Sequence, residues 1–76
     1  MNIIFPIATD YIKLDSLLKG VNAVSSGGEA KLLIADGVVA VNGEQEMRRG
    51  RKLYPGDRVQ FGENAFLVDR LLSEAN

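Results

Sequence analysis

The residue types best suited to chemistry in this chain are cations, and they gather in one short segment. Residues 47–58 carry a net charge of +4 and the rest of the chain −5, which gives −1 for all 76 residues. The basic side chains of this segment are Arg48, Arg49, Arg51, Lys52 and Arg58. A guanidinium group presents a planar fork of donors that matches phosphate oxygens, and its charge acts locally because salt screens it beyond about 8–10 Å. The segment therefore indicates phosphate contacts, although basic residues that merely keep a hairpin end soluble give the same pattern.

A second candidate anion site lies at Gly27 and Gly28, where a helix is predicted to begin. Ser26 has the chemistry of an N-cap, and Glu29 stands where the partner of a capping box stands. Two residues without side chains leave backbone N–H groups accessible at the positive end of the helix. A flexible loop that simply enters the helix is the alternative explanation.

The residues needed for enzymatic chemistry are missing. The chain contains no histidine and no cysteine. This removes the usual general base, the usual zinc ligands and any disulfide. Neither a glycine-rich nucleotide-binding loop nor a nucleophile elbow is present. We therefore expect a binding module and not an enzyme, with no catalytic residues, no cofactor and no metal site.

The centre of the chain predicts the elements that position these residues. Ala30, Leu33, Ile34 and Gly37 follow helical spacing, so we expect a helix from residue 27 to about 36, closed by Gly37 in the left-handed conformation. A β-branched strand over 38–41 should follow, and Asn42-Gly43 is a strong signal for a two-residue hairpin turn.

The flanking segments complete a small single domain over residues 1–76. We expect an edge strand at 3–8 because it contains Pro6, and a short helix at 14–20 that Gly20 ends. Further expected elements are a return strand at 44–48, a loop at 49–52, a Pro55-Gly56 turn of type II, strands at 58–61 and 65–68, and a fraying tail at 69–76. The expected fold class is α+β, with two short helices packed on a small, mainly antiparallel sheet.

The order of these elements resembles the S-four-type RNA-binding domain, whose core is also called the αL RNA-binding motif. The family takes its name from protein four of the small ribosomal subunit. The matching residues, within about 12–60, are Leu14-Asp15, Leu18, Ser26, Ala30-Lys31, Ile34, Gly37, Val39, Val41-Asn42-Gly43 and Gly56-Asp57. The resemblance implies a module that reads structured RNA through its backbone, and stand-alone members are often linked to ribosomal RNA or ribosome assembly.

The resemblance also implies an RNA surface. It consists of Lys13, Ser26, Lys31 and the loop residues Arg48, Arg49, Arg51 and Lys52, and the open helix start adds Gly27 and Gly28 as candidate RNA-binding residues. Many family members carry Arg where this chain has Gly27, a loss that Lys31 partly compensates. We expect Arg49 and Arg51, at the centre of the loop, to contact phosphates from solvent-exposed positions.

Other interpretations remain open at the level of sequence. The same basic loop could face an acidic protein partner, which would make the chain a protein–protein adaptor. Strand, helix and Pro-Gly-Asp elements also occur in β-grasp sulfur carriers, but those proteins end in Gly-Gly and this chain ends in Ser73-Glu74-Ala75-Asn76. Tyr11 and Tyr54 could stack on bases or only border the core. No apolar run is long enough to span a membrane and no signal peptide is evident, so we expect a cytoplasmic protein.

Overall fold

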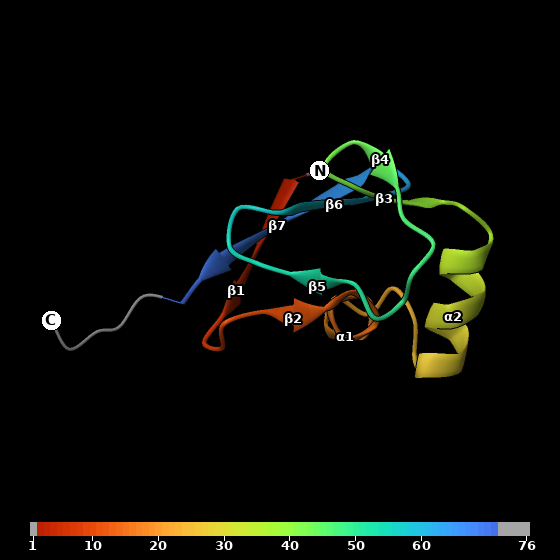
Figure 1. Ribbon diagram of the computed structural model, residues 1–76, viewed down its shortest axis with the longest axis horizontal. Helices are drawn as coiled ribbons and strands as arrows, with labels where there is room; N and C mark the ends of the chain where they lie inside the picture. The colour runs from red at the N-terminus through yellow and green to blue at the C-terminus, as the bar shows by residue number, and fades with distance from the viewer. Residues whose placement is uncertain (1, 72–76) are drawn as a thin grey trace, which may run out of the picture.

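The computed structural model describes residues 2–71, which form two short helices on a curved five-stranded sheet, with a separate two-stranded ribbon at one side (Figure 1). In chain order the elements are β1 (Asn2–Ile7), β2 (Ile12–Lys13), α1 (Leu14–Gly20), α2 (Gly27–Ala35), β3 (Val39–Val41), β4 (Glu44–Gln45), β5 (Lys52–Leu53), β6 (Arg58–Phe61) and β7 (Asn64–Arg70). This confirms the expected α+β class.

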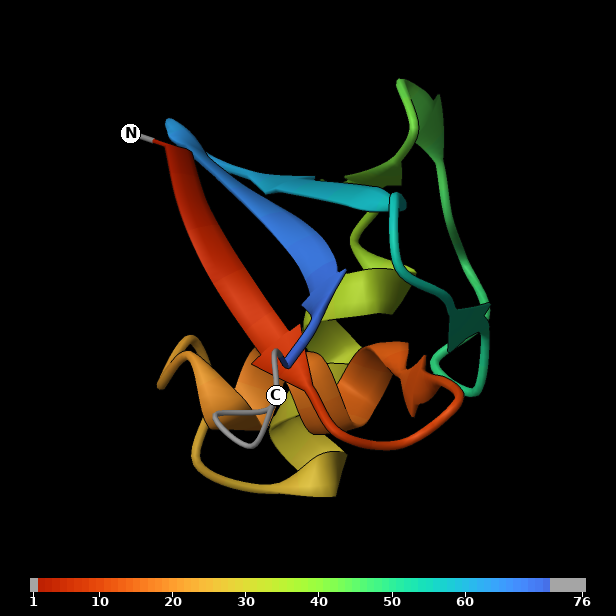
Figure 2. The same ribbon diagram turned by 90° about the vertical axis from the view of Figure 1, so that its left-hand side faces the viewer.

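The main sheet has the strand order β1-β7-β6-β3-β4. All neighbours are antiparallel except β1 and β7, which run parallel with Asn2 opposite Ala65 and Ile7 opposite Arg70. The first and last strands are therefore partners, and β1 lies at the sheet edge, where Pro6 was expected. Figure 2 shows this sheet on one side of the two helices.

The helix ends follow local rules. Ser26 caps α2, with its hydroxyl accepting from Glu29 N, and Gly37 closes the helix at φ +79°. Helix α1 ends differently from the prediction. The left-handed residue is Asn22 at φ 63°, and the N–H groups of Asn22 and Ala23 bond the carbonyls of Lys19 and Leu18 in a Schellman arrangement. Gly20 is the last helical residue, and its missing side chain makes room for the Phe5 ring.

The core lies between the inner sheet face and the helices. Its buried side chains include Leu14, Leu17, Leu18 and Ile34 from the helices and Val39, Val41, Val59, Phe66 and Val68 from the sheet. Leu53 of β5 is also fully buried and faces Ile12 of β2. The paired apolar residues Ile12 and Leu53 therefore anchor the small ribbon to the core.

Several expected boundaries are wrong: Lys52, expected in the loop, begins β5, and its partner β2 was not expected as a strand. The return strand ends at Gln45 and not at residue 48, because Glu46 turns its carboxylate toward arginines of the following loop. Asp69 and Arg70, placed in a fraying tail by the sequence, belong to β7 because they pair with β1. The rest of the expected tail, residues 72–76, lies outside the described residues.

The hairpin between β3 and β4 gives the first test. Asn42 and Gly43 have φ values of 54° and 87°, as a type I′ turn requires. We expect Gly43→Val to lower the free energy of unfolding by about 1–3 kcal/mol, because a β-branched residue is strained at positive φ. Thermal or urea unfolding measures the change. Gly50→Val is the matched control, since an added side chain at Gly50 meets nothing within 4 Å and φ is not positive there. Equal stability of the two variants would contradict the turn assignment.

Candidate nucleic-acid interface

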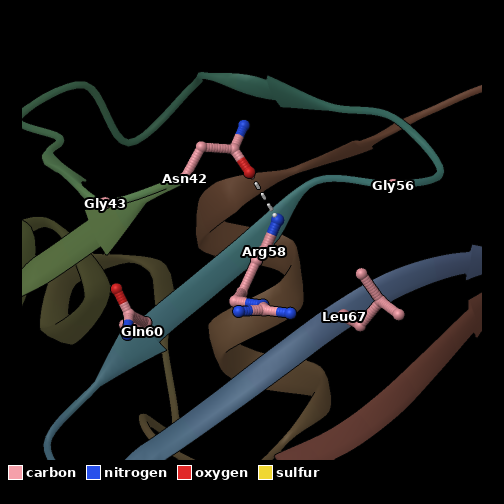
Figure 3. Close-up of a pocket in the computed structure, with 6 residues that line it drawn as sticks. All are labelled: Asn42, Gly43, Gly56, Arg58, Gln60 and Leu67. Carbon is pink, nitrogen blue, oxygen red and sulfur yellow. Dashed lines mark hydrogen bonds between the residues drawn. The ribbon is translucent and has the colours of Figure 1, made fainter.

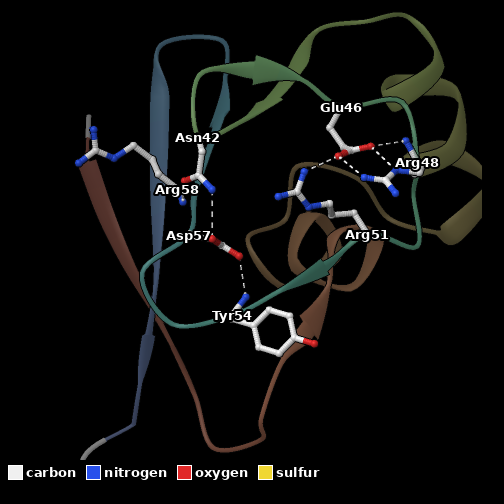
Figure 4. A network of polar contacts seen from close by, with 7 residues as sticks. All are labelled: Asn42, Glu46, Arg48, Arg51, Tyr54, Asp57 and Arg58. Carbon is white, nitrogen blue, oxygen red and sulfur yellow. Dashed lines mark hydrogen bonds and ion pairs between the residues drawn. The ribbon is translucent and has the colours of Figure 1, made fainter.

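A buried carboxylate organises the basic loop, residues 48–52. Glu46 is 5% exposed and lies between two guanidinium groups. Arg48 Nε is 3.0 Å from Glu46 Oε2 and Arg51 Nη1 is 2.7 Å from Oε1, while the backbone N–H of Arg48 donates to Oε2 at 3.0 Å (Figure 4). The hydrogen bond from Arg48 outweighs the effect of burial and, with help from Arg51, lowers the pKa of Glu46 from 4.5 to about 2.

The loop in turn completes the start of helix α1. Leu14 N donates to the carbonyl of Arg51 at 2.9 Å, and Asp15 N donates to the carbonyl of Arg49 at 3.0 Å. Lys13 occupies the N-cap position without a side-chain cap. Two of the N–H groups that a helix start leaves unsatisfied are thus bonded by the basic loop. The loop and the beginning of α1 form one structural unit.

The charge on this unit divides into paired and unpaired cations. The Arg51 side chain is 29% exposed and held by Glu46, so the expectation of a solvent-exposed Arg51 is wrong. Arg48 is also paired with Glu46, although 73% of its side chain is exposed. Arg49 is exposed, and the structure of residues 2–71 gives it no carboxylate partner.

Two lysines continue the cationic surface along the ribbon. Lys13 of β2 and Lys52 of β5 are exposed and lie directly opposite each other in the antiparallel pairing. Like charges at such positions repel and destabilise a sheet. An anion placed over the pair relieves this repulsion. The ribbon therefore presents two adjacent positive charges that no carboxylate within residues 2–71 compensates.

The start of helix α2 is open. An added Cβ at Gly27 would meet nothing within 4 Å, and one at Gly28 only Ser26 Oγ at 3.8 Å, so neither glycine is required by packing. Lys31 is exposed one turn into the helix. The accessible N–H groups and the positive helix end make this a place where an anion can approach closely.

The capping box at this helix differs from the expected one. Glu29 Oε1 accepts from the backbone N–H of Ser25 at 2.6 Å and from its hydroxyl at 2.8 Å, one residue before the cap itself. These hydrogen bonds lower the pKa of Glu29. The carboxylate is thereby tied to the connection between the two helices.

Arg58, the fifth cation of the basic segment, belongs to a different surface. It lies on the outer face of the main sheet beside Gln60 and Leu67, where residues line a hollow of about 400 Å³ (Figure 3). Its backbone N–H donates to Asn42 Oδ1 at 2.9 Å. Figure 4 places it well apart from Arg48 and Arg51. The positive charge of residues 47–58 is therefore split between two faces.

Glu46 is the site residue that the sequence analysis missed. The available signal was an acid placed immediately before a run of arginines, within pairing distance of Arg48 along an extended chain. Nothing in the pattern tells that the acid is buried. Among residues 2–71, no group of three or more acidic residues is arranged to hold a metal ion, and no helix is long and apolar enough to cross a membrane.

Comparison with known proteins identifies a family and a relative of the chain. Residues 5–69 match the S4 domain family. The chain is also 46% identical over 63 residues to a protein of Bacillus subtilis (strain 168) described as "Probable ribosome maturation protein RlbA", an alignment that covers 82% of this chain and 89% of the relative. The matched region includes both helices, the ribbon and the basic loop.

The Glu46 ion pairs give the second test. Glu46→Gln should lower the free energy of unfolding by about 1–3 kcal/mol, because Arg51 then lies half-buried without a carboxylate. For a chain of this size each kcal/mol corresponds to roughly 4–8 °C in Tm. Glu44→Gln is the matched control, since Glu44 is exposed and forms no ion pair within residues 2–71.

The same pair of variants tests the pH dependence. Folding lowers the pKa of Glu46, so the ionised carboxylate stabilises the folded state. This contribution to the free energy of unfolding is complete above about pH 4.5 and is lost as the pH falls toward about 2. The Tm difference between wild type and Glu46→Gln should therefore shrink across this window. A difference that stays constant down to pH 2 would show that the ionised carboxylate does not stabilise the fold.

Proposed function

The chain belongs to the S4 domain family, and from this premise we propose that it is an RNA-binding module that holds structured RNA mainly through phosphate contacts. We propose further that its RNA is ribosomal and that it acts in ribosome maturation, as the description of the Bacillus subtilis relative suggests for that protein. S4 domains typically bind RNA, and the family match and the description of the relative support a non-catalytic role.

The observation that carries this proposal is the unpaired charge on the ribbon and loop. Three cations, Arg49, Lys13 and Lys52, are exposed and have no carboxylate partner in the described part of the chain. All three lie on the unit formed by the basic loop, the ribbon and the start of α1. Phosphate groups spaced along an RNA backbone would neutralise such a row of charges. Because the loop is held by Glu46 and by α1, little conformational entropy would be lost when it meets RNA.

The open start of α2 provides a second contact. Ser26, Gly27 and Gly28 allow a phosphate to reach the backbone N–H groups, and Lys31 adds charge one turn further on. Arg48 and Arg51 have a mainly structural part in this proposal, since Glu46 neutralises much of their charge. Arg48, being largely exposed, can still donate to a phosphate with its free N–H groups.

Salt dependence and charge reversal test the proposal. With about four phosphates neutralised, the log–log slope of affinity against salt should be about −3 to −4 for a structured RNA. Arg49→Glu should weaken binding by about 1–3 kcal/mol and reduce the magnitude of this slope by about one. The Arg49→Glu variant should remain folded, because substitutions of exposed residues usually change the free energy of unfolding by no more than about 0.5 kcal/mol.

Arg70→Glu is the matched charge reversal. Arg70 is exposed at the end of β7 and outside the proposed surface, so binding should change little. A salt slope near zero, or equal losses of RNA affinity for both variants, would contradict the proposed contacts.

Crosslinking in cells with sequencing of the attached RNA identifies the RNA target. Ribosomal RNA enriched beyond its abundance supports a role in ribosome maturation, whereas crosslinks dominated by transfer RNA would exclude that role.

A further inference from the structure

The ribbon has an aromatic end as well as a basic end. Tyr11 directly precedes β2 and Tyr54 directly follows β5, so the antiparallel pairing brings them together at the end opposite the basic loop. Their ring centroids are 5.9 Å apart at an interplanar angle of 49°. The Nζ atom of Lys52 lies 4.9 Å from the centre of the Tyr11 ring. Two rings and a cation thus form one compact surface cluster.

Tyr54 is held at its backbone and open at its ring. Its N–H donates to Asp57 Oδ2 at 2.8 Å, and its carbonyl accepts from Asp57 N at 2.9 Å. Asn42 Nδ2 donates to the other carboxylate oxygen of Asp57 at 3.1 Å, which ties this turn to the β3–β4 hairpin (Figure 4). Tyr54 nevertheless remains 49% exposed. Its backbone is fixed while much of its aromatic surface faces water.

The two rings differ in their availability. Lys52 already covers a face of Tyr11, whose exposure is intermediate. Tyr54 is the more exposed ring and lies beside Lys52. From Lys52 to Tyr54 the chain advances two residues, about 7 Å in an extended strand. A nucleotide whose phosphate contacts Lys13 and Lys52 would therefore have its base within reach of Tyr54.

We propose that Tyr54, supported by Tyr11 and Lys52, is a stacking site for one unpaired RNA base next to the phosphate-binding surface. This inference rests on the proposed RNA-binding function and narrows its ligand to RNA with a bulged, looped or terminal nucleotide. An aromatic ring beside a cation recognises the flat face and the phosphate of such a nucleotide together. A base inside a continuous duplex is stacked on its neighbours and cannot occupy the site.

The composition of the chain makes the stacking site directly observable. Tyr11 and Tyr54 are the only tyrosines, and there is no tryptophan. Tyrosine fluorescence of the wild-type protein therefore reports on this cluster alone. A short RNA stem–loop with one bulged adenosine is the probe, and the same stem with that position paired is its control. Binding of both is followed independently by anisotropy of a dye on the RNA.

The bulged stem should quench the tyrosine fluorescence, and the paired stem should bind without comparable quenching. Tyr54→Ala should weaken binding of the bulged stem by roughly 5- to 150-fold, the range found for base–aromatic stacking. The paired stem should bind this variant almost as it binds wild type. Tyr54→Phe keeps the ring and should retain the affinity. Ile4→Ala, which removes an exposed apolar side chain on another part of the molecule, should have no effect.

The outcomes separate the two proposals. If both stems bind with the expected salt dependence but neither quenches tyrosine, and Tyr54→Ala binds normally, the stacking site is excluded while RNA binding stands. If neither stem binds at any salt concentration, the proposed function fails and the stacking site fails with it. The quenching is measured on wild type, so it decides the question even if Tyr54→Ala is unstable.

Discussion

The ion pairs of Glu46 constrain the functional part of this molecule. A carboxylate buried at 5% exposure must have its charge compensated, and Arg48 and Arg51 supply that compensation. Glu46 directly follows β4, and in the loop that it holds the carbonyls of Arg49 and Arg51 accept hydrogen bonds from the start of α1. Without this interaction the basic loop would be held only by its backbone hydrogen bonds to α1 and by the pairing of β5 with β2.

This arrangement separates cations that are paired with a carboxylate from cations that face solvent without one. The arginines on either side of Arg49 are engaged with Glu46, whereas Arg49 and the lysine pair Lys13 and Lys52 face solvent. The ribbon can hold its two lysines together because Ile12 and the buried Leu53 anchor it to the core. Core packing thus sustains a repulsive surface that RNA phosphates would relieve. In the proposed function, the residues that carry this repulsion are the ones that bind RNA.

Features governed by neighbouring residues could be predicted from the sequence, and those governed by distant ones could not. The Ser26 cap, Gly37 and the Asn42-Gly43 turn depend on local backbone chemistry and are confirmed. The parallel pairing of β1 with β7 joins segments about sixty residues apart, and no periodicity encodes it. The basic loop was recognised by composition, but the burial of Glu46, which decides which arginines are free, depends on the folded chain.

The most direct test of the account is a map of the RNA-contacting surface by ¹H–¹⁵N NMR during titration with a structured RNA. The account predicts that backbone shifts concentrate in residues 11–15, 26–31 and 48–54, the ribbon, the basic loop and the helix starts. These shifts should diminish as salt is raised. Shifts concentrated instead on the outer face of the sheet around Arg58, Gln60 and Leu67 would contradict it, because RNA would then bind a surface that Glu46 does not shape.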